Sequence, residues 1–148
     1  MKVAFTGTRK GMSPHQKKVF RKFCEKHAFD MTTFHHGSCI GADKDASDIV
    51  WEVCAAQIAA HPCTLVKQQA HTKAHTRYPA LDPIERNHVM VDAADILIAC
   101  PATAEEVLRS GTWATIRYAK KMGKEVKIIN PRQWRVLNCK DVERCKDE

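Results

Sequence analysis

The feature that most constrains the fold is a series of short apolar runs separated by stretches with helical periodicity. The runs are 2–7 (KVAFTG), 31–36 (MTTFHH), 63–66 (CTLV), 95–100 (DILIAC) and 125–129 (EVKII). Apolar runs of this length, bounded by glycine or proline, are typical of strands that are covered on both faces in a parallel sheet. The sequence therefore predicts an α/β fold: a single Rossmann-like domain with a parallel sheet of about five strands and helices on both faces.

Four helices are expected between these strands, over 13–27, from about 42 to His61-Pro62, 82–94 and 111–122. Ser13 and Gln16 have the spacing of a capping box, with Pro14 at the first helical position. The second helix is extended to Ile58 because its apolar residues follow the 3.6-residue period. Residues 67–83 show no period and are interpreted as a loop. We expect the domain to cover 1–131, followed by a C-terminal tail over 132–148.

Length and charge limit the class of protein. The chain has 148 residues, which suits one domain, and a formal net charge of +7, which favours anionic partners. No apolar run approaches the roughly 20 residues that span a membrane, and the N-terminus lacks the apolar segment of a signal peptide. We therefore expect a cytoplasmic protein.

The cysteines are expected to be free thiols. There are 7 of them, an odd number, and none is spaced as C-x-x-C. Zinc has possible ligands in His35, His36 and Cys39, and in His71 and His75, but these groups lack a known zinc pattern. The sequence therefore predicts neither a metal nor a cofactor.

Three predicted strand ends are rich in glycine and hydroxyl residues: TGTRKG (6–11), HGSCIGAD (36–43) and RSGTW (109–113). Each loop alone is equally well explained by a tight turn or by close packing of a helix on the sheet. Together, at one edge of one sheet, they indicate a phosphate-bearing ligand, because helix N-termini offer free N–H groups to an anion. The candidate ligand-binding residues are Gly7, Thr8, Arg9, Gly37, Ser38, Gly41, Arg86, Asn87, Arg109, Ser110, Gly111 and Thr112.

The chain resembles the SLOG superfamily, which includes the "lonely guy" phosphoribohydrolases and the DNA-processing protein A domain. The resemblance covers about residues 3–131 and rests on AFTGTRKG, HHGSCIGADKDA and ERNHVMVDAADILIACP…SGTWATIRYAKKMGKEVKIINP. It is closest to small stand-alone SLOG proteins of bacteria and phages. The resemblance implies a nucleotide or nucleotide-derived ligand and a homo-oligomer.

The phosphoribohydrolase pattern is only half present. Gly111 and Thr112 match its Gly-Thr and Arg86 its arginine, but Thr115 stands where the family has a glutamate and Asn87 where it has a lysine. An expanded loop ending in Arg109-Ser110 also replaces a doubled glycine. A carboxylate at position 115 would support cleavage of a glycosidic bond, and threonine does not.

Three other carboxylates are candidates for catalysis. Asp43 follows the second glycine loop, where it is either a ligand contact or a favourable charge in the first turn of a helix. Glu105 and Glu106 precede RSGTW and are more typical of an exposed loop. Trp113 is expected in the core rather than stacked on a base.

Three functions fit these features. We expect the protein to bind a nucleotide or nucleotide-derived, phosphate-bearing small molecule as a sensor or sequestering protein. The first alternative is an N-glycosidase that acts on nucleoside monophosphates through Asp43, Glu105 or Glu106. The second is nucleic-acid binding, which the charge favours but for which no recognition motif is present.

Overall fold

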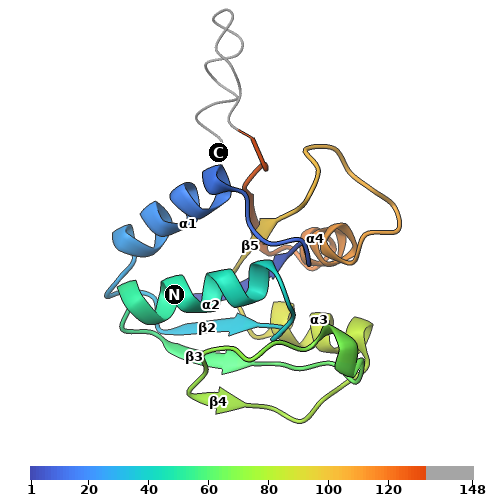
Figure 1. Ribbon diagram of the computed structural model, residues 1–148, viewed down its shortest axis with the longest axis horizontal. Helices are drawn as coiled ribbons and strands as arrows, with labels where there is room; N and C mark the ends of the chain where they lie inside the picture. The colour runs from blue at the N-terminus through green and yellow to red at the C-terminus, as the bar shows by residue number, and fades with distance from the viewer. Residues whose placement is uncertain (133–148) are drawn as a thin grey trace, which may run out of the picture.

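The computed structural model describes residues 1–132, which form a six-stranded parallel sheet with helices on both faces (Figure 1). The strand order is β4-β3-β2-β1-β5-β6. The strands are β1 (Lys2–Gly7), β2 (Thr33–His36), β3 (Gln57–Ala60), β4 (Thr76–Arg77), β5 (Ile96–Cys100) and β6 (Glu125–Ile128). The helices are α1 (Pro14–Lys26), α2 (Ala42–Val53), α3 (Pro83–Asp92) and α4 (Gly111–Lys121). The predicted fold class is confirmed, with six strands in place of about five.

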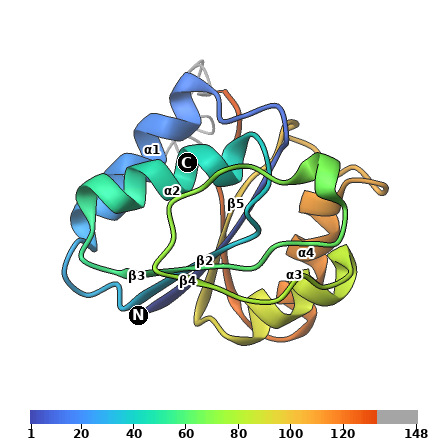
Figure 2. The ribbon, with the colours of Figure 1, turned by 60° about the horizontal axis from the view of Figure 1, so that its bottom comes forward.

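Two hydrophobic cores lie on opposite faces of the sheet. Phe5 of β1 packs with Phe20 of α1 and Val50 of α2 in one core, whereas its neighbour Ala4 packs with Met90 of α3 and Ile116 of α4 in the other. This follows from the alternation of side chains along a strand. Figure 2 shows α1 and α2 on one side of the strands and α3 and α4 on the other. Trp113 belongs to the second core, as predicted.

The start of α1 is fixed as the sequence predicts. Ser13 and Gln16 form the capping box, and Pro14 is the first helical residue. The Gln16 amide also donates hydrogen bonds to the carbonyls of Pro101, at 2.8 Å, and Ile129, at 2.9 Å. Gln16 is 1% exposed, so this one side chain connects the start of α1 to the ends of β5 and β6.

The second helix is shorter than predicted. It ends at Val53, and Cys54 takes an extended backbone conformation with φ −112° and ψ 151°. Ile58, which we placed in the helix, lies in β3 and pairs with Phe34 of β2. Periodicity does not separate a short buried strand from the end of a helix, because both are apolar. Ile58 would be buried against the sheet as part of a helix and is buried in the sheet as part of a strand, so burial does not distinguish the two.

The strand predicted over 63–66 is also wrong. Cys63 makes only an isolated bridge with Leu81, and Val66–Gln68 is a turn of 3₁₀ helix. The predicted loop 67–83 instead contains the edge strand β4, which pairs with β3. Apart from Arg132, the tail predicted over 132–148 lies outside the described residues.

The strand order places a crevice beside β1. After β1 the chain moves to β2 and β3 on one side, and it later returns to β5 on the other. Loops that leave β1 and β5 therefore diverge at their carboxyl ends, which is where parallel α/β sheets bind ligands. All three glycine-rich loops meet at this edge.

Candidate functional site

A cavity of about 410 Å³ lies at the carboxyl edge of the sheet, between the ends of β1 and β2 and the N-termini of α3 and α4. Most of the candidates from the sequence line it. Those are Gly7, Thr8, Arg9, Gly37, Asp43, Arg86, Asn87, Arg109, Ser110, Gly111 and Thr112. The fold therefore brings together residues that are more than 100 positions apart in the chain.

The N-terminus of α4 forms one wall of the cavity. Ser110 is its N-cap and accepts a hydrogen bond from the Trp113 amide at 3.3 Å. The amides of Gly111 and Thr112 have no acceptor among the described residues, as is usual for the first helical turn. Thr112 is only 8% exposed, and its hydroxyl also has no partner among residues 1–132. This wall therefore presents several unused hydrogen-bond donors to the cavity.

Three cations surround these donors. Arg9, Lys10 and Arg109 line the cavity, and all are exposed. Within residues 1–132 none of them pairs with a carboxylate. Their charges add to the positive end of the α4 dipole. An anion at this wall would therefore meet N–H donors and unpaired positive charge together.

Arg86 is a buried and rigid part of the site. Its Nη1 atom donates to the carbonyl oxygens of Gly37, at 2.8 Å, and His61, at 3.0 Å, while Nε donates to Asn87 Oδ1 at 2.8 Å. The guanidinium thus binds α3 to the ends of β2 and β3. Nη2 contacts only the Cys39 sulfur among the described residues, so part of its donor capacity faces the cavity.

Asp43 is the carboxylate of the cavity. It lies in the first turn of α2, is 6% exposed, and accepts a hydrogen bond from the Cys39 amide at 3.2 Å. Burial raises the pKa of Asp43 to about 6, although the charge of Arg86 and the N–H groups of Cys39 and Gly37 act in the opposite direction. The group is therefore ionised at neutral pH and takes up a proton in mild acid.

Close contacts require glycine at three positions of the site, one of which is Gly7, where a Cβ atom would lie 2.5 Å from the Ala42 Cβ. A Cβ atom on Gly37 would lie 2.6 Å from Arg86 Nη1 and 2.9 Å from Asp43 Oδ2, so any side chain there would displace both charged groups. Gly41 has φ +88°, and a Cβ atom would lie 2.3 Å from the Arg9 carbonyl oxygen. Gly111 differs, because a Cβ atom there meets nothing within 4 Å. Its exposed position leaves room in the cavity.

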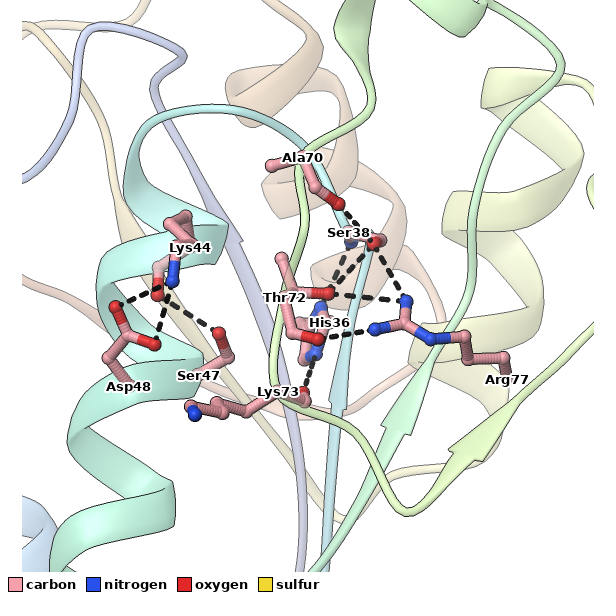
Figure 3. A network of polar contacts seen from close by, with 9 residues as sticks. All are labelled: His36, Ser38, Lys44, Ser47, Asp48, Ala70, Thr72, Lys73 and Arg77. Atoms are coloured by element: carbon pink, nitrogen blue, oxygen red, sulfur yellow. Dashed lines mark hydrogen bonds and ion pairs between the residues drawn. The ribbon is translucent and has the colours of Figure 1, made fainter.

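Four of the predicted site residues do not line the cavity. Ser38 turns away, and its hydroxyl lies 2.8 Å from Thr72 Oγ1, beside the segment that leads to β4 (Figure 3). Gly41 serves as the N-cap of α2. Glu105 is exposed, and Glu106 forms an ion pair with Arg117 at 2.7 Å on the outside of α4. Loop spacing alone did not reveal the direction of these side chains.

Thr115 cannot replace the glutamate of the phosphoribohydrolase pattern. It is 1% exposed, and its hydroxyl donates to the Gly111 carbonyl within its own helix at 2.9 Å. It does not line the cavity. Among the described residues, Asp43 is thus the carboxylate left to act on a ligand.

The sequence analysis missed several residues of the cavity wall. Thr6 lies in the first strand, and Lys10 lies in the glycine-rich loop that follows it. The glycine-rich pattern around them could therefore have identified both as cavity residues. Thr103 binds the indole N–H of Trp113 at 3.3 Å, and Gln68 comes from the predicted loop 67–83. No pattern in the sequence connects Gln68 to the other three.

A second hollow, of about 600 Å³, lies between α1 and the edge of the sheet at β6. Lys18, Lys22 and Lys26 of α1 and Lys127 of β6 contribute to its lining. It lies away from all three glycine-rich loops. Its larger size does not make it the better candidate, because none of the residues of the glycine-rich loops lines it.

Solved structures share this architecture. The molybdenum cofactor binding protein of Rippkaea orientalis aligns over 86% of this chain and 74% of its own, with 17% identity and a TM-score of 0.65. A structural genomics target, TM1055, aligns over 84% and 71%, with 18% identity and a TM-score of 0.59. DNA processing protein A of Helicobacter pylori aligns over 86% and 64%, with 19% identity and a TM-score of 0.58.

The chain has the SLOG-type fold. At these identities the likeness shows the fold alone, and the chain spans less than two thirds of the DNA processing protein A chain. No family model matches the sequence, and a search of curated proteins finds no significant match. The ligand of this SLOG-type domain must therefore be inferred from its own cavity.

Within residues 1–132 the structure contains neither a helix that could span a membrane nor a cluster of metal ligands. No helix in this range is both long and apolar enough to cross a membrane. No three His, Cys, Asp or Glu side chains in it are placed to hold a metal ion. The five described cysteines, Cys24, Cys39, Cys54, Cys63 and Cys100, are free. Cys139 and Cys145 lie outside the described residues.

Proposed function

We propose that this protein binds a nucleotide, or a nucleotide-derived small molecule that carries a phosphate, in the cavity beside β1. The observation that carries the proposal is the α4 N-terminus, where the amides of Gly111 and Thr112, which have no acceptor among the described residues, line one wall together with the Thr112 side chain. Helix N-termini with free N–H groups are common phosphate sites. The role is that of a sensor or a sequestering protein.

The charge of the cavity supports an anionic ligand. Among residues 1–132, four cations line it against one carboxylate, that of Asp43: Arg9, Lys10, Arg86 and Arg109. The volume of about 410 Å³ is in the range of small-molecule sites. Met90 and Val107 add apolar surface against which a base or sugar would pack. Asn87, with its amide bonded to Arg86, is a further polar contact for the ligand.

The substitution Gly111→Val tests whether the phosphate binds at the N-terminus of α4. We call this position, formed by Ser110, Gly111 and Thr112, the phosphate seat. No protein atom lies within 4 Å of a Cβ atom at this position, so the variant should fold normally while its side chain fills the space before the helix. Ala114→Val, at an exposed position of the same helix, is the matched control. Calorimetry measures the binding of the four common ribonucleoside 5′-monophosphates to each protein. We expect this binding to be lost in Gly111→Val and kept in the control.

Retention of full affinity by a folded Gly111→Val variant would place the phosphate elsewhere. Mass spectrometry of small molecules released from the denatured, purified protein would identify a ligand carried from the cell. The proposal would be contradicted if neither experiment detected binding of a phosphate-bearing compound to this protein.

The hydrolase alternative rests on Asp43, the one carboxylate lining the cavity among residues 1–132. Base release from nucleoside monophosphates, followed by chromatography, tests it directly. Multiple turnovers that stop in Asp43→Asn would favour an N-glycosidase. We expect binding without release, because Thr115 leaves the family's catalytic position without a carboxylate.

Nucleic-acid binding is the remaining alternative. Its support is the net charge of +7 and the single-stranded DNA binding of the structurally similar DNA processing protein A of Helicobacter pylori. Affinity for a polymer falls steeply with salt, because counterions are released from many phosphates. We expect little binding of single-stranded DNA at physiological salt.

We also expect the protein to form a homo-oligomer, which light scattering will test.

A further inference from the structure

A phosphate seat does not explain Asp43. A carboxylate repels phosphate, yet this one is 94% buried in a cavity that otherwise carries positive charge. The surrounding structure holds it in place, with the Cys39 amide donating to Oδ2 at 3.2 Å and Gly37 leaving no room for a side chain between it and Arg86. A rigid acceptor of this kind must face a part of the ligand that is not phosphate.

The topology separates Asp43 from the phosphate seat. Asp43 lies at the start of α2, which follows β2, whereas Gly111 and Thr112 start α4, which follows β5. Strands β2 and β5 flank β1 on opposite sides. A ligand in the cavity therefore extends from α4, across the end of β1, to Asp43. In a nucleotide bound by its phosphate, the sugar is the part next to that phosphate.

We propose that Asp43 accepts hydrogen bonds from the vicinal hydroxyl groups of a ribose, so that the cavity selects ribonucleotides over deoxyribonucleotides. An ionised carboxylate only accepts hydrogen bonds, and the two hydroxyls of a ribose are paired donors. In other doubly wound folds an acidic residue beside the phosphate loop binds a ribose hydroxyl in this way. This inference rests on the proposed function and adds the sugar to it.

Asp43 and the charged and titratable groups around it differ in the pH at which they change protonation. Among them, Asp43 is the group that titrates near neutral pH. The charge of Arg86, in α3, favours the ionised form of Asp43. The Cys39 thiol, in the loop before α2, has its pKa raised to about 12 by burial and by the charge of Asp43. Cys100, at the end of β5, also has its pKa raised, chiefly by burial. Sugar recognition should therefore follow the protonation of Asp43.

The experiment compares ribonucleoside, 2′-deoxy and 3′-deoxy nucleoside 5′-monophosphates by calorimetry at pH 8 and pH 5. We expect the wild type to favour the ribo series by about tenfold or more at pH 8, the size expected for a hydrogen bond to a charged group. The preference should shrink at pH 5. Asp43→Asn should bind both series similarly and keep its affinity for inorganic pyrophosphate.

Asp48→Asn is the matched control, because Asp48 is a half-exposed carboxylate of the same helix that pairs with Lys44 at 3.0 Å. It should keep both the preference and its pH dependence. Equal affinity for the ribo and deoxy series in the wild type overturns the inference while leaving the proposed function intact. So does a ribose preference that persists in Asp43→Asn. Failure of every nucleotide and of pyrophosphate to bind removes both proposals.

Discussion

Replacing Asp43 by asparagine is expected to stabilise the protein at neutral pH. The ordinary pKa of this carboxyl is 3.8 and burial raises it to about 6 in the folded state. Because the folded state holds the proton more tightly, the stability from this group is complete below pH 3.8 and is lost as the pH rises through 6. Asparagine keeps an acceptor for the Cys39 amide but carries no charge, so it avoids that loss.

The size of the effect follows from the pKa difference. A difference of about 2.2 pH units corresponds to about 3 kcal/mol at pH 8, at about 1.4 kcal/mol per unit. At pH 5 the same two pKa values give about 2 kcal/mol. The free energy of unfolding of Asp43→Asn should therefore exceed that of the wild type by these amounts. Such a gain is typical of residues kept for binding at a cost in stability.

Urea denaturation of both proteins at several pH values between 5 and 8 provides the measurement. Subtracting the wild type from the variant cancels every other titrating group, since all are shared. Asp48→Asn should give a small, flat difference because its side chain is 44% exposed. A less stable Asp43→Asn protein at pH 8, or a difference independent of pH, would refute the reasoning.

Three other substitutions test the framework of the fold. Gln16→Leu leaves two buried carbonyls without donors and should lower the free energy of unfolding by about 2–6 kcal/mol in urea denaturation; a loss under 1 kcal/mol would contradict this ~1–3 kcal/mol cost per group. Gly41→Ala should be strongly destabilising in thermal melts, because it strains a positive φ and meets the Arg9 backbone; an unchanged Tm would count against it. Burial lowers the pKa of His36 to about 4, so its contribution of about 3 kcal/mol is present above pH 6.5 and is lost as the pH falls toward 4. In acid, protonation also removes the acceptor that His36 offers to the Ser38 amide, and His36→Gln should show a flatter pH profile of stability than the wild type.

Local patterns in the chain were enough to predict most of the sheet. The run ILIAC forms β5, and the capping box of Ser13 and Gln16 starts α1 where it was placed. These features depend on neighbouring residues, which the sequence displays directly. The glycine-rich loops likewise predicted which edge of the sheet carries a cavity, because parallel strands end at the same edge.

The predictions from sequence were wrong where the conformation of a segment, or the direction of a side chain, depends on residues far away in the chain. Ile58 fits a helical period, but pairing with Phe34 makes its segment a strand. Ser38 has the spacing of a ligand contact, but Thr72, 34 residues away, holds its hydroxyl. In both cases the competing interaction is with a residue far along the chain, which local pattern does not record.

The sequence by itself determined a parallel α/β domain and the loops that surround the cavity at the carboxyl edge of its sheet. Only the tertiary structure decided which side chains enter the cavity. It turned Glu106 outward to Arg117 and buried Asp43 beside Arg86, although both acidic residues lie next to glycine-rich loops in the sequence. The reason is that burial and side-chain direction depend on how α2, α3 and α4 pack on the sheet, and that packing joins residues from all parts of the chain.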